Sequence, residues 1–269
     1  MNDRSDAATP EFTYGTYLRI PELLSLQQPA SDPPEHDETL FIIIHQVYEL
    51  WFKQVLHELD QFVDHLNDDH PHRGHHLLKR VLKIFKTLVA QLDVLETMTP
   101  LEFESFRKFL ANASGFQSVQ FRELEFLLGA KSEDHLKRFA DQPELADRLR
   151  RRLIAPSLWD AYVAFLDRAG YSIDPEVLTR DVRQPLEPSA SVQDALVEVY
   201  RTNPALAELC ESLTDLDEGL QEWRYRHVKM VQRTIGTKPG TGGSAGSDYL
   251  KTTLFRPVFP DLWEIRVRF

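Results

Sequence analysis

The chain has 269 residues, 42% of them hydrophobic, and a formal net charge of −11 at pH 7. This length and composition suit one domain with a sizeable core, and the negative charge argues against nucleic acid as a partner. No apolar run approaches the roughly 18 residues that cross a membrane, and the N-terminus lacks the apolar stretch of a signal peptide. The only cysteine, Cys210, is expected to be a buried apolar residue. We therefore expect a cytoplasmic protein.

The N-terminal segment divides into a polar tail and a short aromatic arm. Residues 1–12 are polar and predict a disordered tail. In residues 13–21, Tyr14, Tyr17 and Leu18 form an apolar segment that needs a surface to pack on. A proline-rich stretch over residues 27–37 then interrupts regular structure before the first long helix.

A histidine interrupts the apolar face of that first long helix, which we expect at about residues 38–67. Apolar positions there recur at spacings of three and four, as one face of a helix requires; they are Phe41, His45, Tyr48, Phe52, Val55, Leu59, Phe62 and Leu66. The His45 imidazole should therefore point inward, where an unpartnered polar ring costs about 1–3 kcal/mol. A second helix is expected at about 75–98. The polar turn between the two helices carries His70, His72, His75 and His76, which we interpret as solvated surface rather than a metal site.

A shorter helix carries an arginine on its apolar face. Thr99, Pro100 and Glu102 have the order of an N-cap, an N1 proline and a capping-box glutamate. Arg107 follows between Phe103 and Leu110, and an inward guanidinium requires an anion. Ser114 and Gly115 then separate this helix from an amphipathic stretch over residues 116–129.

The C-terminal half contains a second buried histidine. Residues 130–170 predict two or three short helices, and residues 171–189 predict a loop. A long helix should begin at about 191 or 204 and end near 235, followed by a glycine-rich loop over residues 236–246 and a last short helix at 247–254. Its apolar stripe consists of Leu206, Leu209, Leu213, Leu216, Leu220, Trp223, His227 and Met230.

Two inward histidines and one inward arginine favour a single shared ligand site, although each histidine alone is more simply a satisfied core residue. His227 on a rigid helix suits an axial haem ligand, and four flanking basic residues could meet haem propionates: Arg224, Arg226, Lys229 and Arg233. The sequence has no Glu-x-x-His motif, which excludes a di-iron carboxylate bundle. With no strand-like alternation, the residues predict an all-α protein, a single domain of long bundle helices that binds haem or another ligand.

Four long stretches, over residues 12–20, 36–60, 95–129 and 223–250, together resemble the tryptophan 2,3-dioxygenase family. The resemblance implies a single all-α haem dioxygenase domain at 13–269, with its helices around a haem pocket. It further implies ferrous haem b as cofactor, dioxygen as co-substrate, and conversion of L-tryptophan to N-formyl-L-kynurenine. A homotetramer built as a dimer of dimers is also implied.

The same resemblance assigns roles to the residues singled out above. His227 would be the axial ligand of the haem iron, and His45 the catalytic residue that hydrogen-bonds the indole N–H. Arg107 would pair with the substrate carboxylate. The remaining substrate-binding positions are Phe41, Phe103, Leu110, Ser114, Gly115 and Thr241, with Ser114 and Gly115 also beside the haem, and Tyr14, Tyr17 and Leu18 from a neighbouring subunit's exchanged arm.

Two positions depart from the family pattern. Phe103 stands where some bacterial members have a tyrosine that also bonds the carboxylate, and Ala245 replaces a common serine in the glycine-rich loop. The Ala245 change keeps one alternative open, a related haem monooxygenase that acts on a tryptophan derivative. The other is a haem sensor without catalysis, in which Arg107 would bind a propionate.

Overall fold

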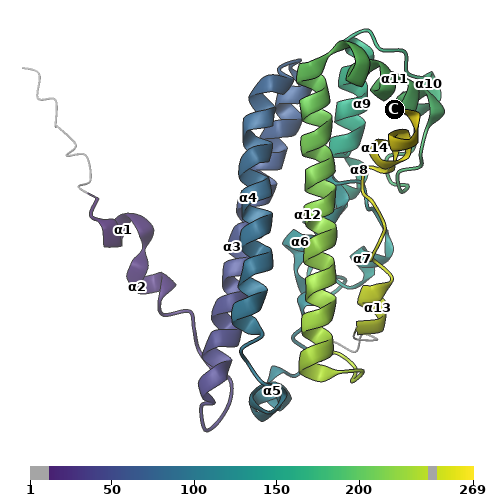
Figure 1. Ribbon diagram of the computed structural model, residues 1–269. Helices are drawn as coiled ribbons and strands as arrows, with labels where there is room; N and C mark the ends of the chain where they lie inside the picture. Colours follow the sequence, from purple (N-terminus) through teal and green to yellow (C-terminus); the bar gives the residue numbers. More distant parts are fainter. Residues whose placement is uncertain (1–11, 242–246) are drawn as a thin grey trace, which may run out of the picture.

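The computed structural model describes residues 12–241 and 247–269, and every regular element in those ranges is a helix (Figure 1). The all-α prediction is therefore confirmed. The expected disordered tail lies outside the described residues except for Phe12, and Ala245 lies outside them as well. No described helix is long and apolar enough to span a membrane.

Three long helices form the body of the molecule: α3 (His36–Asn67), α4 (Pro71–Leu95) and α12 (Pro204–Ile235). Both α3 and α12 pack along α4, as Figure 1 shows. The α3 stripe is buried from Tyr48 to Leu66, and every apolar member of the α12 stripe is also buried. Phe41, His45 and His227 are the half-buried members of these stripes, and all three line a cavity.

The helix α12 begins at Pro204, the second of the two expected starting positions, 191 and 204. Asn203 caps the helix by accepting a hydrogen bond from the Leu206 N–H at 3.2 Å, and Pro204 occupies the first helical position. Residues upstream form a separate helix, α11 (Ala190–Thr202). A proline inside a continuous helix would remove one backbone hydrogen bond, so the chain breaks at this point.

The helix that carries Arg107 is α5 (Pro100–Arg107), and its expected cap is confirmed. The Thr99 hydroxyl accepts from the Glu102 N–H at 3.4 Å, and the Glu102 carboxylate accepts from the Thr99 N–H at 2.6 Å. The chain continues through the 3₁₀ turns η1 (Lys108–Leu110) and η2 (Gly115–Gln117). The expected stretch over 116–129 is thus partly a 3₁₀ turn, and its α-helix α6 (Val119–Leu127) begins only after Ser118, whose hydroxyl caps it.

Shorter helices complete the structure. Residues 130–170, where we expected two or three short helices, form three: α7 (Asp134–Lys137), α8 (Pro143–Ile154) and α9 (Leu158–Arg168). The segment expected as a loop contains α10 (Pro175–Leu178). The last expected helix is α13 (Ser247–Lys251). Beyond it lie two elements that the sequence did not predict, α14 (Pro260–Glu264) and η3 (Ile265–Arg268).

A buried aspartate on α12 holds this C-terminal segment in place. The Asp217 carboxylate accepts hydrogen bonds from the Val258 N–H at 2.9 Å, the Phe259 N–H at 3.0 Å and the Trp263 indole N–H at 3.0 Å. Asp217 is itself fully buried. One side chain therefore satisfies two backbone donors that would otherwise be unpaired in the core, and it also binds the partly exposed Trp263 indole.

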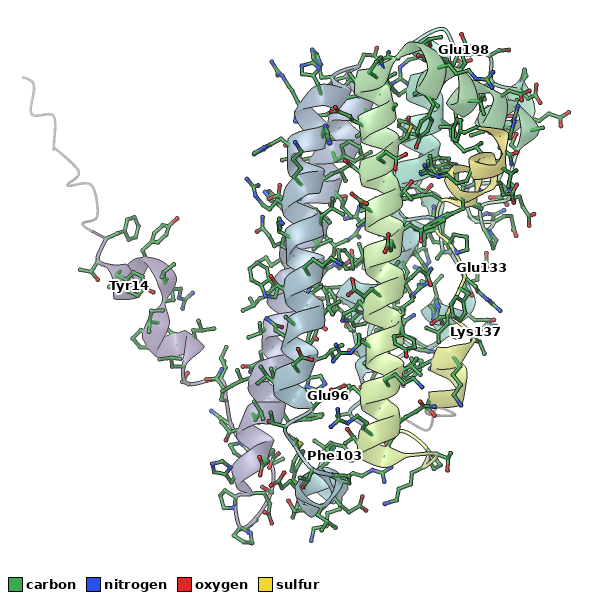
Figure 2. The ribbon with its side chains drawn as sticks, viewed as in Figure 1. Tyr14, Glu96, Phe103, Glu133, Lys137 and Glu198 are labelled. Atoms are coloured by element: carbon green, nitrogen blue, oxygen red, sulfur yellow. The ribbon has the colours of Figure 1, made fainter. Side chains whose placement is uncertain are left out.

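The N-terminal arm extends away from the helix bundle. It consists of α1 (Tyr14–Leu18) and α2 (Ile20–Leu23), and Figure 2 shows Tyr14 well apart from the long helices. Tyr14 is 79% exposed, and Tyr17 and Leu18 are exposed as well. The arm joins the body near α3, where the Gln27 amide donates to the Gln46 side-chain oxygen at 2.6 Å.

Two minor predictions can also be compared with the structure. Cys210 is buried and lies 2.9 Å from the Tyr162 hydroxyl, which confirms the structural interpretation. His70, His72 and His76 are exposed, as expected for solvated surface. His75 is half-buried instead, because its ring contacts the Ser212 hydroxyl at 2.8 Å on α12.

Candidate active site

A single cavity brings together most of the residues singled out from the sequence. It lies among α3, α5, α6, α12 and the segment that follows α12, and Figure 2 shows Phe103 near the lower ends of the long helices. The predicted residues that line it are Phe41, His45, Phe103, Arg107, Leu110, Ser114, Gly115, His227 and Thr241. Tyr14, Tyr17 and Leu18 are on the arm and do not line it.

His45 enters the site with a defined tautomer. Its Nδ1 lies 2.7 Å from the carbonyl oxygen of Phe41, one turn earlier on α3. A carbonyl can only accept, so Nδ1 carries the proton and Nε2 of the neutral ring is a hydrogen-bond acceptor. Burial lowers the pKa of His45, although the Phe41 carbonyl and the Glu49 charge act in the opposite direction. The ring is therefore neutral near pH 7 and presents an acceptor to a ligand.

Aromatic rings pack around His45 and form one wall of the cavity. The Phe41 ring lies 4.1 Å from the His45 ring between centroids, and 5.7 and 5.5 Å from the rings of Phe103 and Phe106. Phe103 and Phe106 are buried, so this arrangement is rigid. A flat apolar ring with one polar N–H would match such a wall.

His227 offers an uncommitted ring nitrogen. The imidazole stacks on the Trp223 indole, with centroids 5.2 Å apart and an interplanar angle of 9°. Burial lowers the pKa of His227 to about 4, and the nearby His45 and Arg122 contribute to the same direction. No hydrogen bond to this ring is present among the described residues. A neutral imidazole without another partner is suited to bind a metal.

Arg107 lines the cavity beside the segment that follows α12. Its Nη2 donates to the Pro239 carbonyl at 2.6 Å, and the side chain is 19% exposed. The Thr241 hydroxyl donates to the Ala113 carbonyl, and Lys238 forms an ion pair with Glu104 at 3.1 Å. These contacts hold residues 238–241 against α5 and its following turn, so that Arg107 and Thr241 both line the cavity.

Sequence reasoning missed a buried pair of charged residues in the site. Arg122 and Glu125 on α6 line the cavity, and both are buried. They form an ion pair with each other, and Glu125 also accepts from Arg224 on α12 at 2.9 Å. An Arg and a Glu three residues apart are usual on the exposed face of a helix, so the spacing gave no signal.

The residues present fit a haem group. Among the described residues, no three His, Cys, Asp or Glu side chains come close enough to hold a bare metal ion. Iron bound to His227 would therefore need most of its ligands from outside the protein chain, as a porphyrin supplies. The apolar walls and the buried arginines suit the ring and its ionised edge.

Fold and site together define an all-α protein with a pocket lined by aromatic rings, two histidines and several arginines. Comparison with known proteins names the family. A family model described as tryptophan 2,3-dioxygenase matches residues 2–157 and 176–268. The chain belongs to the tryptophan 2,3-dioxygenase family.

Individual relatives agree over nearly the whole chain, and each of the following carries the name tryptophan 2,3-dioxygenase. The chain is 58% identical to the protein of Herpetosiphon aurantiacus, with 94% of this chain and 97% of the relative covered. It is 52% identical to that of Anaeromyxobacter sp. strain K, with 99% of both chains covered. It is 45% identical to that of Bacillus thuringiensis strain Al Hakam, with 95% and 92% covered.

Proposed function

We propose that this protein is a haem-dependent dioxygenase that inserts both atoms of O₂ across the indole C2–C3 bond of L-tryptophan to give N-formyl-L-kynurenine. Residues 13–269 would act as one all-α haem dioxygenase domain. The observation that carries the proposal is the convergence of His45, Arg107 and His227 on one cavity. This reaction needs three groups, which these residues would supply in turn: an acceptor for the indole N–H, a cation for the carboxylate and a free imidazole for the iron.

His227 would hold the cofactor, ferrous haem b in the active state. When bound, the haem supplies the binding and activation of dioxygen, chemistry that protein side chains lack. The stacked Trp223 ring fixes the orientation of His227. Ser114 and Gly115, which line the same cavity from the turn before α6, would lie beside the haem and the dioxygen.

The protein's own contribution is the orientation of the substrate. The indole N–H would donate to Nε2 of His45, which the Phe41 carbonyl keeps in the accepting tautomer. Phe41, Phe103 and Leu110 would contact the ring. Holding the reacting bond in one position removes much of the entropic part of the barrier.

The amino-acid end of the substrate would bind at Arg107. A carboxylate there would replace the Pro239 carbonyl with a charge-assisted bond, which is stronger than the bond it displaces. Thr241 would bond the same end of the substrate. Since Phe103 has no hydroxyl group, Arg107 carries the recognition of the carboxylate.

The exposed arm is the basis for the proposed assembly. Tyr14, Tyr17 and Leu18 expose apolar surface that a second copy of the chain would cover. We propose a homotetramer, a dimer of dimers, in which this arm completes the pocket of a neighbouring subunit. The proposed location is the cytoplasm.

A direct assay tests the proposed reaction. The purified protein is reconstituted with haem, reduced, and mixed with L-tryptophan while dissolved dioxygen and the absorbance of N-formylkynurenine are followed together. We expect dioxygen consumption and product formation to proceed at equal molar rates. A protein that binds haem yet consumes no dioxygen with tryptophan would instead be a haem sensor.

A further inference from the structure

A buried cluster of three charged side chains forms part of the cavity wall and has no role in the orientation of the substrate. Arg122 is 6% exposed, Glu125 5% and Arg224 7%. One carboxylate oxygen of Glu125 pairs with Arg122, and the other accepts from Arg224 at 2.9 Å. A single carboxylate thus serves two guanidinium groups, and the cluster retains one net positive charge.

The surroundings of the two arginines leave part of their hydrogen-bonding capacity unused. Arg224 donates through Nη1 to the Thr253 carbonyl, at a long 3.4 Å. Arg122 lies over the rings of Phe116 and Phe121, and its buried Nε has no partner in the part of the chain that the structure describes. A buried guanidinium that is only partly compensated is costly and favours a further anion.

The neighbouring titratable groups that the structure describes do not supply that anion. His135 on α7 faces the cluster, and burial lowers its pKa, so it is neutral near pH 7. Glu49, a second described carboxylate on the cavity wall, already accepts from the Gln120 amide at 2.8 Å. Arg138 adds a further positive charge, because its guanidinium lies 5.2 Å from the Phe116 ring.

The basic residues that flank His227 on α12 differ in where they point. Arg226 pairs with Asp93 at 2.6 Å, and Arg233 pairs with Glu96 at 2.8 Å. Neither of these arginines lines the cavity, whereas Arg224 does. Arg224 precedes His227 by three residues, a spacing that puts both side chains on one face of the helix.

We propose that Arg122 and Arg224 bind the propionate carboxylates at the edge of the haem ring, and that Glu125 holds the two guanidinium groups in place. This inference rests on the proposed function, because it assigns the haem to the same cavity. The two anion sites of the cavity then have separate ligands. Arg107 takes the carboxylate of the substrate, and the buried cluster takes those of the cofactor.

Haem dimethyl ester tests this assignment because its propionates carry no charge. Apoprotein is titrated with haem and with the diester, and both affinities are measured from the absorbance of the bound ring. We expect the unaltered protein to bind haem at least about tenfold more tightly than the diester, the effect of one hydrogen bond to a charged group. Arg122→Gln should weaken haem binding by about tenfold and leave the affinity for the diester unchanged.

Arg107→Gln is the matched control, since it removes a guanidinium from the same cavity and should leave the ratio of the two affinities unaltered. If Arg122→Gln weakens haem and diester equally, Arg122 has only a structural role and the inference is wrong. If circular dichroism shows that this variant does not fold, the unaltered protein decides: equal affinity for haem and diester overturns the inference alone. Failure to bind either ring overturns the proposed function, and this inference with it.

Discussion

The replacement Arg107→Gln removes the charge that we assign to the substrate carboxylate but keeps a polar side chain. Loss of one partner of a buried charge pair costs about 2–5 kcal/mol. The Arg107 side chain is 19% exposed, and it must give up its 2.6 Å bond to the Pro239 carbonyl when substrate binds. Both effects favour the lower end of that range, about 2 kcal/mol, which corresponds to roughly thirtyfold weaker binding.

Equilibrium binding of L-tryptophan and of tryptamine, which has the same indole and amine but no carboxylate, would measure this effect. The variant should lose about thirtyfold in affinity for tryptophan and bind tryptamine as the unaltered protein does. Arg226→Gln is a suitable control, because Arg226 pairs with Asp93 and does not line the cavity. An equal loss for both ligands would refute the carboxylate contact.

Three further predictions concern His227, His45 and Asp217. His227→Ala should not retain haem on purification, and an unaltered haem spectrum would contradict the ligand assignment. His45→Phe should keep haem but lower kcat/KM for tryptophan. Burial lowers the pKa of His45 below 6.5, and the protonated ring cannot accept a hydrogen bond at Nε2. We therefore expect kcat/KM of the unaltered protein to fall only below pH 6.5. If the pH profile of His45→Phe shows the same fall, His45 is not its cause. Asp217→Ala leaves the buried N–H groups of Val258 and Phe259 unpaired, so the free energy of unfolding should drop by about 2 kcal/mol or more. An unchanged thermal unfolding midpoint would argue against the anchor.

The long helices could be predicted because their apolar spacing repeats over many turns. The capping box at Thr99 and Glu102 could also be predicted, because it depends only on neighbouring residues. Two elements at the C-terminus could not be predicted. α14 and η3 are short, and Asp217 anchors the segment that carries them from more than 40 positions earlier in the chain. Such a tertiary contact has no local pattern.

The same contrast applies to the site. His45, Arg107 and His227 were found because a polar residue in an apolar stripe breaks the expected pattern. Two contacts could not be predicted in this way: the bond from His45 to the Phe41 carbonyl, and the pairing of Arg122 with Glu125 inside the cavity. A spacing of three or four residues on a helix is the same for a buried and for an exposed pair, and only the packing around it distinguishes the two.

Isotope labelling provides the most direct test of the proposed reaction. The haem-reconstituted and reduced protein is incubated with L-tryptophan under ¹⁸O₂, and the product is analysed by mass spectrometry. A dioxygenase places both labelled atoms in one molecule of N-formyl-L-kynurenine, and we expect that result. A product with one labelled atom would show a monooxygenase and contradict the account.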